Sequence, residues 1–134
     1  MLPTTSENCA SKTKSLPPPA KQNHGVNHIH SKSSFETSVV SGSKSRVVLL
    51  DCFATWCGPC KAIAPKIIQM SLEDKYKDSV EFYKIDVDEV PDVAQELGIR
   101  AMPTFLVYKD GEKVEEVVGA NERAIRAAID KYVS

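Results

Sequence analysis

DCFATWCGPCKAIAP, residues 51–65, contains two cysteines three positions apart, with a Trp before them and a Gly-Pro pair between them. A pair at this spacing, here Cys57 and Cys60, occurs in metal sites, in structural disulfides and in thiol pairs that exchange electrons. The neighbouring sequence is needed to decide among the three.

The cysteine pair lies between a predicted strand and a predicted helix. RVVLLDCFA, residues 46–54, is an apolar run of strand length around Asp51, typical of a strand covered by helices on both faces. CKAIAPKIIQMSLEDKY, residues 60–76, has large apolar side chains at helical spacing, with Pro65 in the interior. These side chains are Ile63, Ile67, Met70 and Tyr76. We therefore expect the pair at the beginning of a helix and Asp51 inside the core.

The segment before this strand also has a regular pattern. VNHIH, residues 26–30, predicts an edge strand. SKSSFETSVV, residues 31–40, predicts a helix capped by Ser31. Its inward residues are expected to be Phe35, Val39 and Val40.

The remaining sequence completes an alternating order of strands and helices. VEFYKIDV, residues 80–87, predicts a second central strand, and residues 89–99 predict a short helix that ends at a glycine. Residues 104–119 predict two strands joined at an Asp-Gly turn, and residues 121–133 predict an amphipathic helix with an Asn cap. The order β-α-β-α-β-α-β-β-α predicts an α/β fold, with a central mixed sheet flanked by helices on both faces.

The composition is that of one ordinary globular domain. The chain has 134 residues, 17 basic and 18 acidic side chains, and no apolar run near the roughly 20 residues that cross a bilayer. We therefore expect no binding to nucleic acid and no membrane segment. Residues 1–24 carry almost no large apolar side chains, which predicts a disordered extension of a domain spanning residues 25–134. The few cysteines and the absence of a secretory signal favour the cytoplasm, with mitochondria as the alternative because the extension is rich in Lys and Ser.

A metal site is not expected. Structural zinc needs four ligands, usually two cysteine pairs or one pair with two histidines. No second pair is present, because Cys9 belongs to the extension and Cys52 has no partner at that spacing. His28 and His30 point the same way from a strand, but exposed histidines without a partner cluster are more often solvated than metal-bound.

A redox pair requires fewer assumptions than a metal site. A thiolate is the attacking species in disulfide exchange, and the dipole and free N–H groups of a helix N-terminus favour it at Cys57. Cys60 lies one turn further along the helix, where it can attack the mixed disulfide. Pro59 stiffens the turn and Gly58 lets a partner chain approach, so both are expected to tune the redox poise. An inert disulfide or a pair of core thiols is the alternative.

WCGPC, residues 56–60, resembles the active-site motif of the thioredoxin family, and the resemblance runs from about residue 26 to the end of the chain. In GIRAMPT, residues 98–104, Pro103 matches the cis-proline that faces the disulfide in that family. The further matching residues are Asp51, Lys84, Pro65 and Gly119. The resemblance implies a thioredoxin fold.

The resemblance also implies roles for individual residues. Asp51 would be the buried carboxylate that accepts and donates the proton of Cys60, although a buried acid satisfied by Lys84 or a backbone donor is the alternative. Lys84 would tune the redox poise. The substrate-binding residues would be Trp56, Met102, Pro103 and Gly119. Cys52, which points to the opposite face of its strand from Asp51, would only pack in the core.

The implied function is reduction of protein disulfides through Cys57 and Cys60, within cell redox homeostasis. The protein would be a monomer without a bound cofactor, re-reduced by an NADPH-dependent thioredoxin reductase, and would donate electrons to reductases and peroxiredoxins. Two alternatives are an oxidising or isomerising catalyst of the secretory pathway and a binding module that uses the groove without turnover. The sequence shows neither a signal peptide nor a retention tail, and both cysteines are intact.

Overall fold

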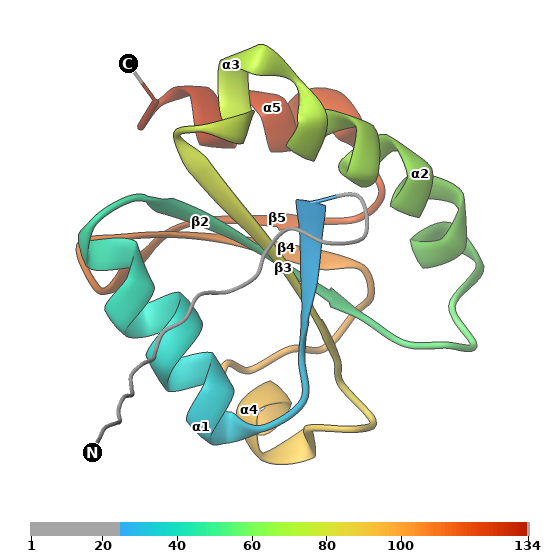
Figure 1. The fold of residues 1–134 in the computed structure, drawn as a ribbon. Helices are drawn as coiled ribbons and strands as arrows, with labels where there is room; N and C mark the ends of the chain where they lie inside the picture. Colours follow the sequence, from blue (N-terminus) through green and yellow to red (C-terminus); the bar gives the residue numbers. More distant parts are fainter. Residues whose placement is uncertain (1–24, 134) are drawn as a thin grey trace, which may run out of the picture.

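The computed structural model describes residues 25–133, which contain a five-stranded sheet in the order β1-β3-β2-β4-β5 (Figure 1). The strands are β1 (Val26–Ile29), β2 (Val47–Phe53), β3 (Val80–Asp86), β4 (Thr104–Lys109) and β5 (Glu112–Val118). Strands β1, β3 and β2 run parallel, whereas β4 and β5 are antiparallel to their neighbours. The sheet is therefore mixed, with the expected edge strand at β1.

Helices cover both faces of the sheet. They are α1 (Lys32–Phe35), continued by a π-helical segment (Glu36–Ser41) and a 3₁₀ turn (Gly42–Lys44), and α2 (Gly58–Leu72), α3 (Asp74–Lys77), α4 (Pro91–Glu96) and α5 (Glu122–Asp130). Helices α1 and α4 lie on one face, and α2, α3 and α5 lie on the other (Figure 1). This arrangement confirms the predicted α/β architecture.

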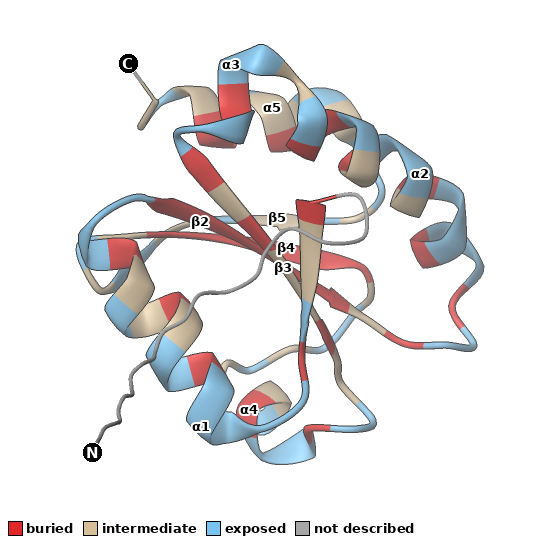
Figure 2. Cartoon of the chain, in the orientation of Figure 1, coloured by how far each residue is buried: buried red, intermediate tan, exposed pale blue. Residues whose placement is uncertain are grey.

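Strand β2 contributes side chains to both cores. Val47 and Leu49 pack in the cluster that includes the apolar residues of α2, α3 and α5. Val48, Leu50 and Cys52 pack in the cluster on the α1 and α4 face. Because side chains alternate along a strand, Asp51 shares the face of Leu49 and is directed toward the α2 layer. The buried residues gather on the central strands and on the sides of the helices that face them (Figure 2).

The predicted caps and turns are present. Ser31 and Asn121 accept hydrogen bonds from the backbone N–H groups three residues on, at 3.1 Å in each case. Asp110 and Gly111 both have positive φ angles, 56° and 85°, which is the backbone geometry of the tight turn expected between β4 and β5. The residues that form each of these caps and turns lie within a few positions of one another, so the sequence alone predicts them.

The helix predicted for residues 60–76 is interrupted. Helix α2 ends at Leu72, Glu73 is extended with ψ 142°, and Tyr76 lies in the separate α3. The Glu73 carboxylate accepts two hydrogen bonds from the guanidinium of Arg126, at 2.8 and 2.7 Å, and the Tyr76 hydroxyl donates to Asp130 at 2.7 Å. These contacts join the break to α5. Side-chain spacing within residues 60–76 could not reveal them, because they involve a helix about 50 residues away.

None of the helices within residues 25–133 is both long and apolar enough to cross a membrane. The extension expected for residues 1–24 lies outside the described residues, so its disorder and the proposed domain boundary stay predictions.

Ile125→Ala should destabilise the protein by about 2–5 kcal/mol, because Ile125 is fully buried between α5 and the sheet and its loss leaves a cavity. Chemical denaturation followed by circular dichroism measures the change. Arg123→Ala on the exposed side of the same helix is the matched control and should alter stability by less than about 0.5 kcal/mol. Equal effects of the two substitutions would contradict the assigned core.

Candidate redox site

Cys57 and Cys60 form a disulfide at the beginning of α2, with their Cα atoms 5.3 Å apart. Cys57 is the N-cap residue of the helix, and its sulfur accepts a hydrogen bond from the backbone N–H of Cys60 at 3.1 Å. Pro59 occupies the first turn, where its missing N–H leaves no helical hydrogen bond unmade. The predicted position of the pair is therefore confirmed, and the helix N-terminus is directed at the Cys57 sulfur.

The two cysteines are both buried and belong to one apolar cluster. Cys57 and Cys60 are 4% and 5% exposed and pack with Ala54. Gly58 is exposed between them, and a Cβ added there would meet nothing within 4 Å. An incoming chain can therefore approach the disulfide over Gly58.

The segment around Pro103 borders the disulfide. The Met102-Pro103 peptide bond is cis, as the family resemblance implies. Met102 packs against the cluster that contains both cysteines. The Pro103 carbonyl accepts a hydrogen bond from the N–H of Gly119 at 2.8 Å, and Gly119 has φ +106°, a conformation that favours glycine. Gly119 thus holds the cis-proline segment against the end of β5.

Trp56 is the large exposed hydrophobic residue beside the cysteines, with 66% of its surface accessible. Its indole N–H donates a hydrogen bond of 2.8 Å to the carboxylate of Asp88, in the turn after β3. Sequence reasoning missed Asp88. The only available signal was its place just after the predicted strand of residues 80–87, because parallel neighbours β2 and β3 end at the same edge of the sheet.

Asp51 is buried and lines a cavity together with Cys60. Within residues 25–133 no donor reaches its Oδ1 atom, so the alternative of a fully satisfied buried acid is not supported. Burial raises the pKa of Asp51 to about 7, although the nearby positive charge of Lys84, its register partner on β3, acts in the opposite direction. A carboxyl with this pKa can both accept and donate a proton near neutral pH.

Asp51 and Cys60 line the same cavity, of about 250 Å³. Lys84 and Phe53 also line it, and the Lys84 ammonium lies 5.7 Å from the centre of the Phe53 ring. The other lining residues are Ala54, Thr55, Lys61 and Ala64. The cavity is mostly apolar but large enough to admit water, for which Asp51 and Lys84 offer polar partners.

Cys52 lies outside this chemistry. It is a buried free cysteine on the opposite face of β2 from Asp51. Burial, reinforced by the charge of Asp51, raises the pKa of its thiol well above the ordinary value, which disfavours the reactive thiolate. The expected packing role agrees with this environment, and Cys9 lies outside the described residues.

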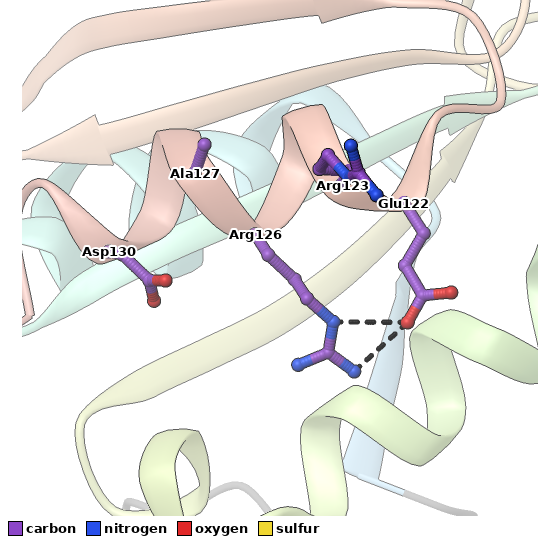
Figure 3. A pocket seen from close by; sticks show the side chains of 5 residues that line it. All are labelled: Glu122, Arg123, Arg126, Ala127 and Asp130. Atoms are coloured by element: carbon purple, nitrogen blue, oxygen red, sulfur yellow. Dashed lines mark hydrogen bonds and ion pairs between the residues drawn. The ribbon is translucent and has the colours of Figure 1, made fainter.

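A second pocket, on α5, is lined mainly by charged side chains, but these do not make it a binding site. It is lined by Glu122, Arg123, Arg126, Ala127 and Asp130 (Figure 3). The Arg126 guanidinium is directed at Glu122 and also pairs with Glu73, so its donors are already engaged within the protein. We therefore assign this arrangement to packing between α5 and the break after α2.

Comparison with known sequences identifies the family. The sequence model of the thioredoxin family matches residues 26–131. A thioredoxin of Aspergillus fumigatus is 51% identical over 111 residues, which are 83% of this chain and 98% of the relative. Thioredoxin-2 of Saccharomyces cerevisiae is 49% identical over 108 residues, 81% of this chain and 99% of the relative.

Solved structures give the same result. The Malassezia sympodialis thioredoxin structure matches with a TM-score of 0.74 and 44% identity, over 82% of this chain and 95% of that one. Thioredoxin NaTrxh from Nicotiana alata matches with a TM-score of 0.75 and 43% identity, over 90% of this chain and 100% of that one. The cysteine pair at the start of α2, the cis-proline beside it and these matches show that the chain belongs to the thioredoxin family of protein-disulfide oxidoreductases, which bind no cofactor.

Proposed function

We propose that the chain reduces disulfides in other proteins with Cys57 as the attacking nucleophile and Cys60 as the resolving thiol. The observation that carries the assignment is the position of Cys57 as N-cap, where the Cys60 N–H already donates to its sulfur. In the dithiol form the same donor and the helix dipole favour a Cys57 thiolate. Cys60 lies in the first turn of the helix and lines the same cavity as Asp51.

The exchange takes place in two steps that together move two electrons. The Cys57 thiolate attacks one sulfur of the substrate disulfide, so a mixed disulfide forms and the other substrate sulfur leaves as a thiolate and takes up a proton. Cys60 then loses its proton and attacks the Cys57 sulfur. The Cys57–Cys60 disulfide forms, and the substrate is released as a dithiol.

Asp51 is the proposed acceptor of the Cys60 proton in the second step. Its pKa of about 7 leaves a useful fraction of the carboxylate free at neutral pH, and both groups line one cavity. Lys84, which also lines the cavity, is proposed to adjust this equilibrium by favouring the charged form of Asp51. Gly58 and Pro59 are proposed to tune the redox poise through the geometry of the turn.

The proposed substrate surface consists of Trp56, Met102, Pro103 and Gly119. An extended substrate segment would pair with the backbone of Met102 beside Pro103, which is a form of strand addition and tolerates many sequences. Trp56 would supply apolar contact area at the edge of this surface.

The proposed electron source is an NADPH-dependent thioredoxin reductase, and the proposed recipients include disulfide-containing reductases and peroxiredoxins. The proposed working form is a monomer in the cytosol. A reducing compartment suits a chain in which Cys52 is a buried free thiol in the core. The domain of residues 25–134 is proposed to carry the whole of this activity.

Removing either cysteine should separate the two steps. Cys57→Ser should abolish insulin reduction in the presence of thioredoxin reductase and NADPH, because no attacking thiolate remains. Cys60→Ser should accumulate mixed disulfides, detectable as added mass on non-reducing gels, because the second step is lost. NADPH consumption measures turnover.

Cys52→Ala is the matched control and should retain turnover, since Cys52 lies on the other face of β2. Insulin reduction that survives in Cys57→Ser would refute the assignment of the nucleophile. Wild-type protein without cysteine-dependent turnover would leave only the binding-module alternative.

Asp51→Asn should reduce turnover at pH 7 by about tenfold or more, because an amide cannot accept the Cys60 proton. The alkylation rate of Cys57 in the reduced protein should change little, since that thiolate depends on the helix N-terminus. Stopped-flow turnover and iodoacetamide trapping measure the two quantities. Unchanged turnover would exclude Asp51 as the proton acceptor.

The same substitution should stabilise the protein at high pH. The pKa of Asp51 is about 7 in the folded protein against an ordinary value of 3.8, so the folded state binds the proton more tightly than the unfolded state. Asp51 therefore lowers stability progressively as pH rises from about 4 to 7, by as much as about 4 kcal/mol. Asp51→Asn should gain most over wild type at pH 8 and little at pH 4. Denaturant titrations at both pH values test this dependence.

A further inference from the structure

We propose that His28, His30 and Glu89 form a binding site for a divalent transition metal such as Zn²⁺. The two histidines come from the edge strand β1 and the residue following it, and Glu89 comes from the turn between β3 and α4. The metal-ligating atoms of these three residues all lie within 4.8 Å of one another. The histidines were expected to be solvated for want of a partner, and the fold supplies that partner from 59 residues further along the chain.

One ring nitrogen of each histidine lies close to one of the two carboxylate oxygens of Glu89. His28 Nε2 lies 3.3 Å from Glu89 Oε1, and His30 Nδ1 lies 2.8 Å from Glu89 Oε2. The imidazole rings are stacked, with centroids 4.1 Å apart and planes 25° apart, so their nitrogens approach the carboxylate from the same side. Residues at alternate positions of a strand point in the same direction, which explains the stacking.

The donor set suits zinc-type metals. Neutral imidazole nitrogen and carboxylate oxygen bind Zn²⁺ at about 2.0–2.2 Å, which in tetrahedral geometry places ligand atoms roughly 3.3–3.5 Å apart. The observed separation of 3.3 Å between His28 and Glu89 is already of this size. Three protein ligands leave a fourth position for water, and all three side chains are exposed enough to adjust and to admit the ion.

The local charges act in both directions, and on His28 the positive charge of Lys84 acts more strongly than the negative charge of Glu89 or Asp86. Glu89 contributes one negative charge to the site, and Asp86 acts on His28 with the same sign. Lys84 opposes them from the neighbouring strand. His28 also contacts the edge of the Phe53 ring, with centroids 5.7 Å apart, which helps to orient its imidazole.

Isothermal titration of the oxidised full-length protein with Zn²⁺ tests the proposal. The disulfide form is required because the free thiols of Cys57 and Cys60 would themselves bind the metal. We expect saturable binding of one ion per chain. His30→Gln and Glu89→Gln should each weaken the affinity at least about tenfold, since each removes one of three ligands.

Two control variants separate this site from other donors. His24→Gln removes the third histidine of the chain, and Cys9→Ser removes a thiol outside the redox pair. Both should bind Zn²⁺ as wild type does. Absence of saturable binding would overturn the proposal, as would binding that persists in His30→Gln or disappears in His24→Gln or Cys9→Ser. Insulin reduction at the wild-type rate by His30→Gln and Glu89→Gln, measured without added metal, would show that these variants are folded.

Discussion

The structure depends on the burial of strand β2, in which every residue except Phe53 is buried. This strand is hydrogen bonded to β3 on one edge and β4 on the other, and helices cover both of its faces. Its position is therefore fixed from four sides. Strand β2 ends at Phe53 and α2 begins at Gly58. Because the connection is so short, the position of the Cys57 sulfur relative to the sheet is fixed. A strand at the edge of the sheet could not hold a reactive group so firmly.

The same burial creates the unusual carboxyl of the site. A charged group on a buried strand is costly, and Asp51 responds by holding its proton up to neutral pH. The chemistry proposed for Asp51 and the stability that it costs have one physical origin. Lys84 moderates the effect from the adjacent register position on β3. The pairing of β2 with β3 thus limits how far burial raises the pKa of this carboxyl.

Much of the fold could be predicted because its signals are local. The apolar run of β2, the Asp110-Gly111 turn and the Asn121 cap each depend on residues within a few positions of one another. The cysteine pair belongs to the same class, since both its spacing and its place before a helix are visible in one short stretch. Family resemblance added Pro103 and Gly119, whose link to the site is a backbone hydrogen bond that no periodicity encodes.

The contacts that escaped prediction join segments far apart in the chain. Arg126 meets the break at Glu73 across 53 positions, and Asp88 meets Trp56 across 32. Glu89 meets His30 across 59 positions. Each depends on which loops the sheet order brings to one edge, and a single sequence does not contain that information in any local pattern. The turn after β3 is the clearest example, because its consecutive residues Asp88 and Glu89 serve two different clusters.

The hydrogen bond between Trp56 and Asp88 has a consequence for recognition. A large exposed ring normally samples several rotamers, and fixing such a side chain on association costs roughly 0.5–1.5 kcal/mol. The indole of Trp56 is held by its N–H while two thirds of its surface stays accessible. Much of that ordering is therefore complete before a partner arrives. The substrate surface proposed around Trp56 would therefore be largely rigid before association and would lose little entropy with each partner.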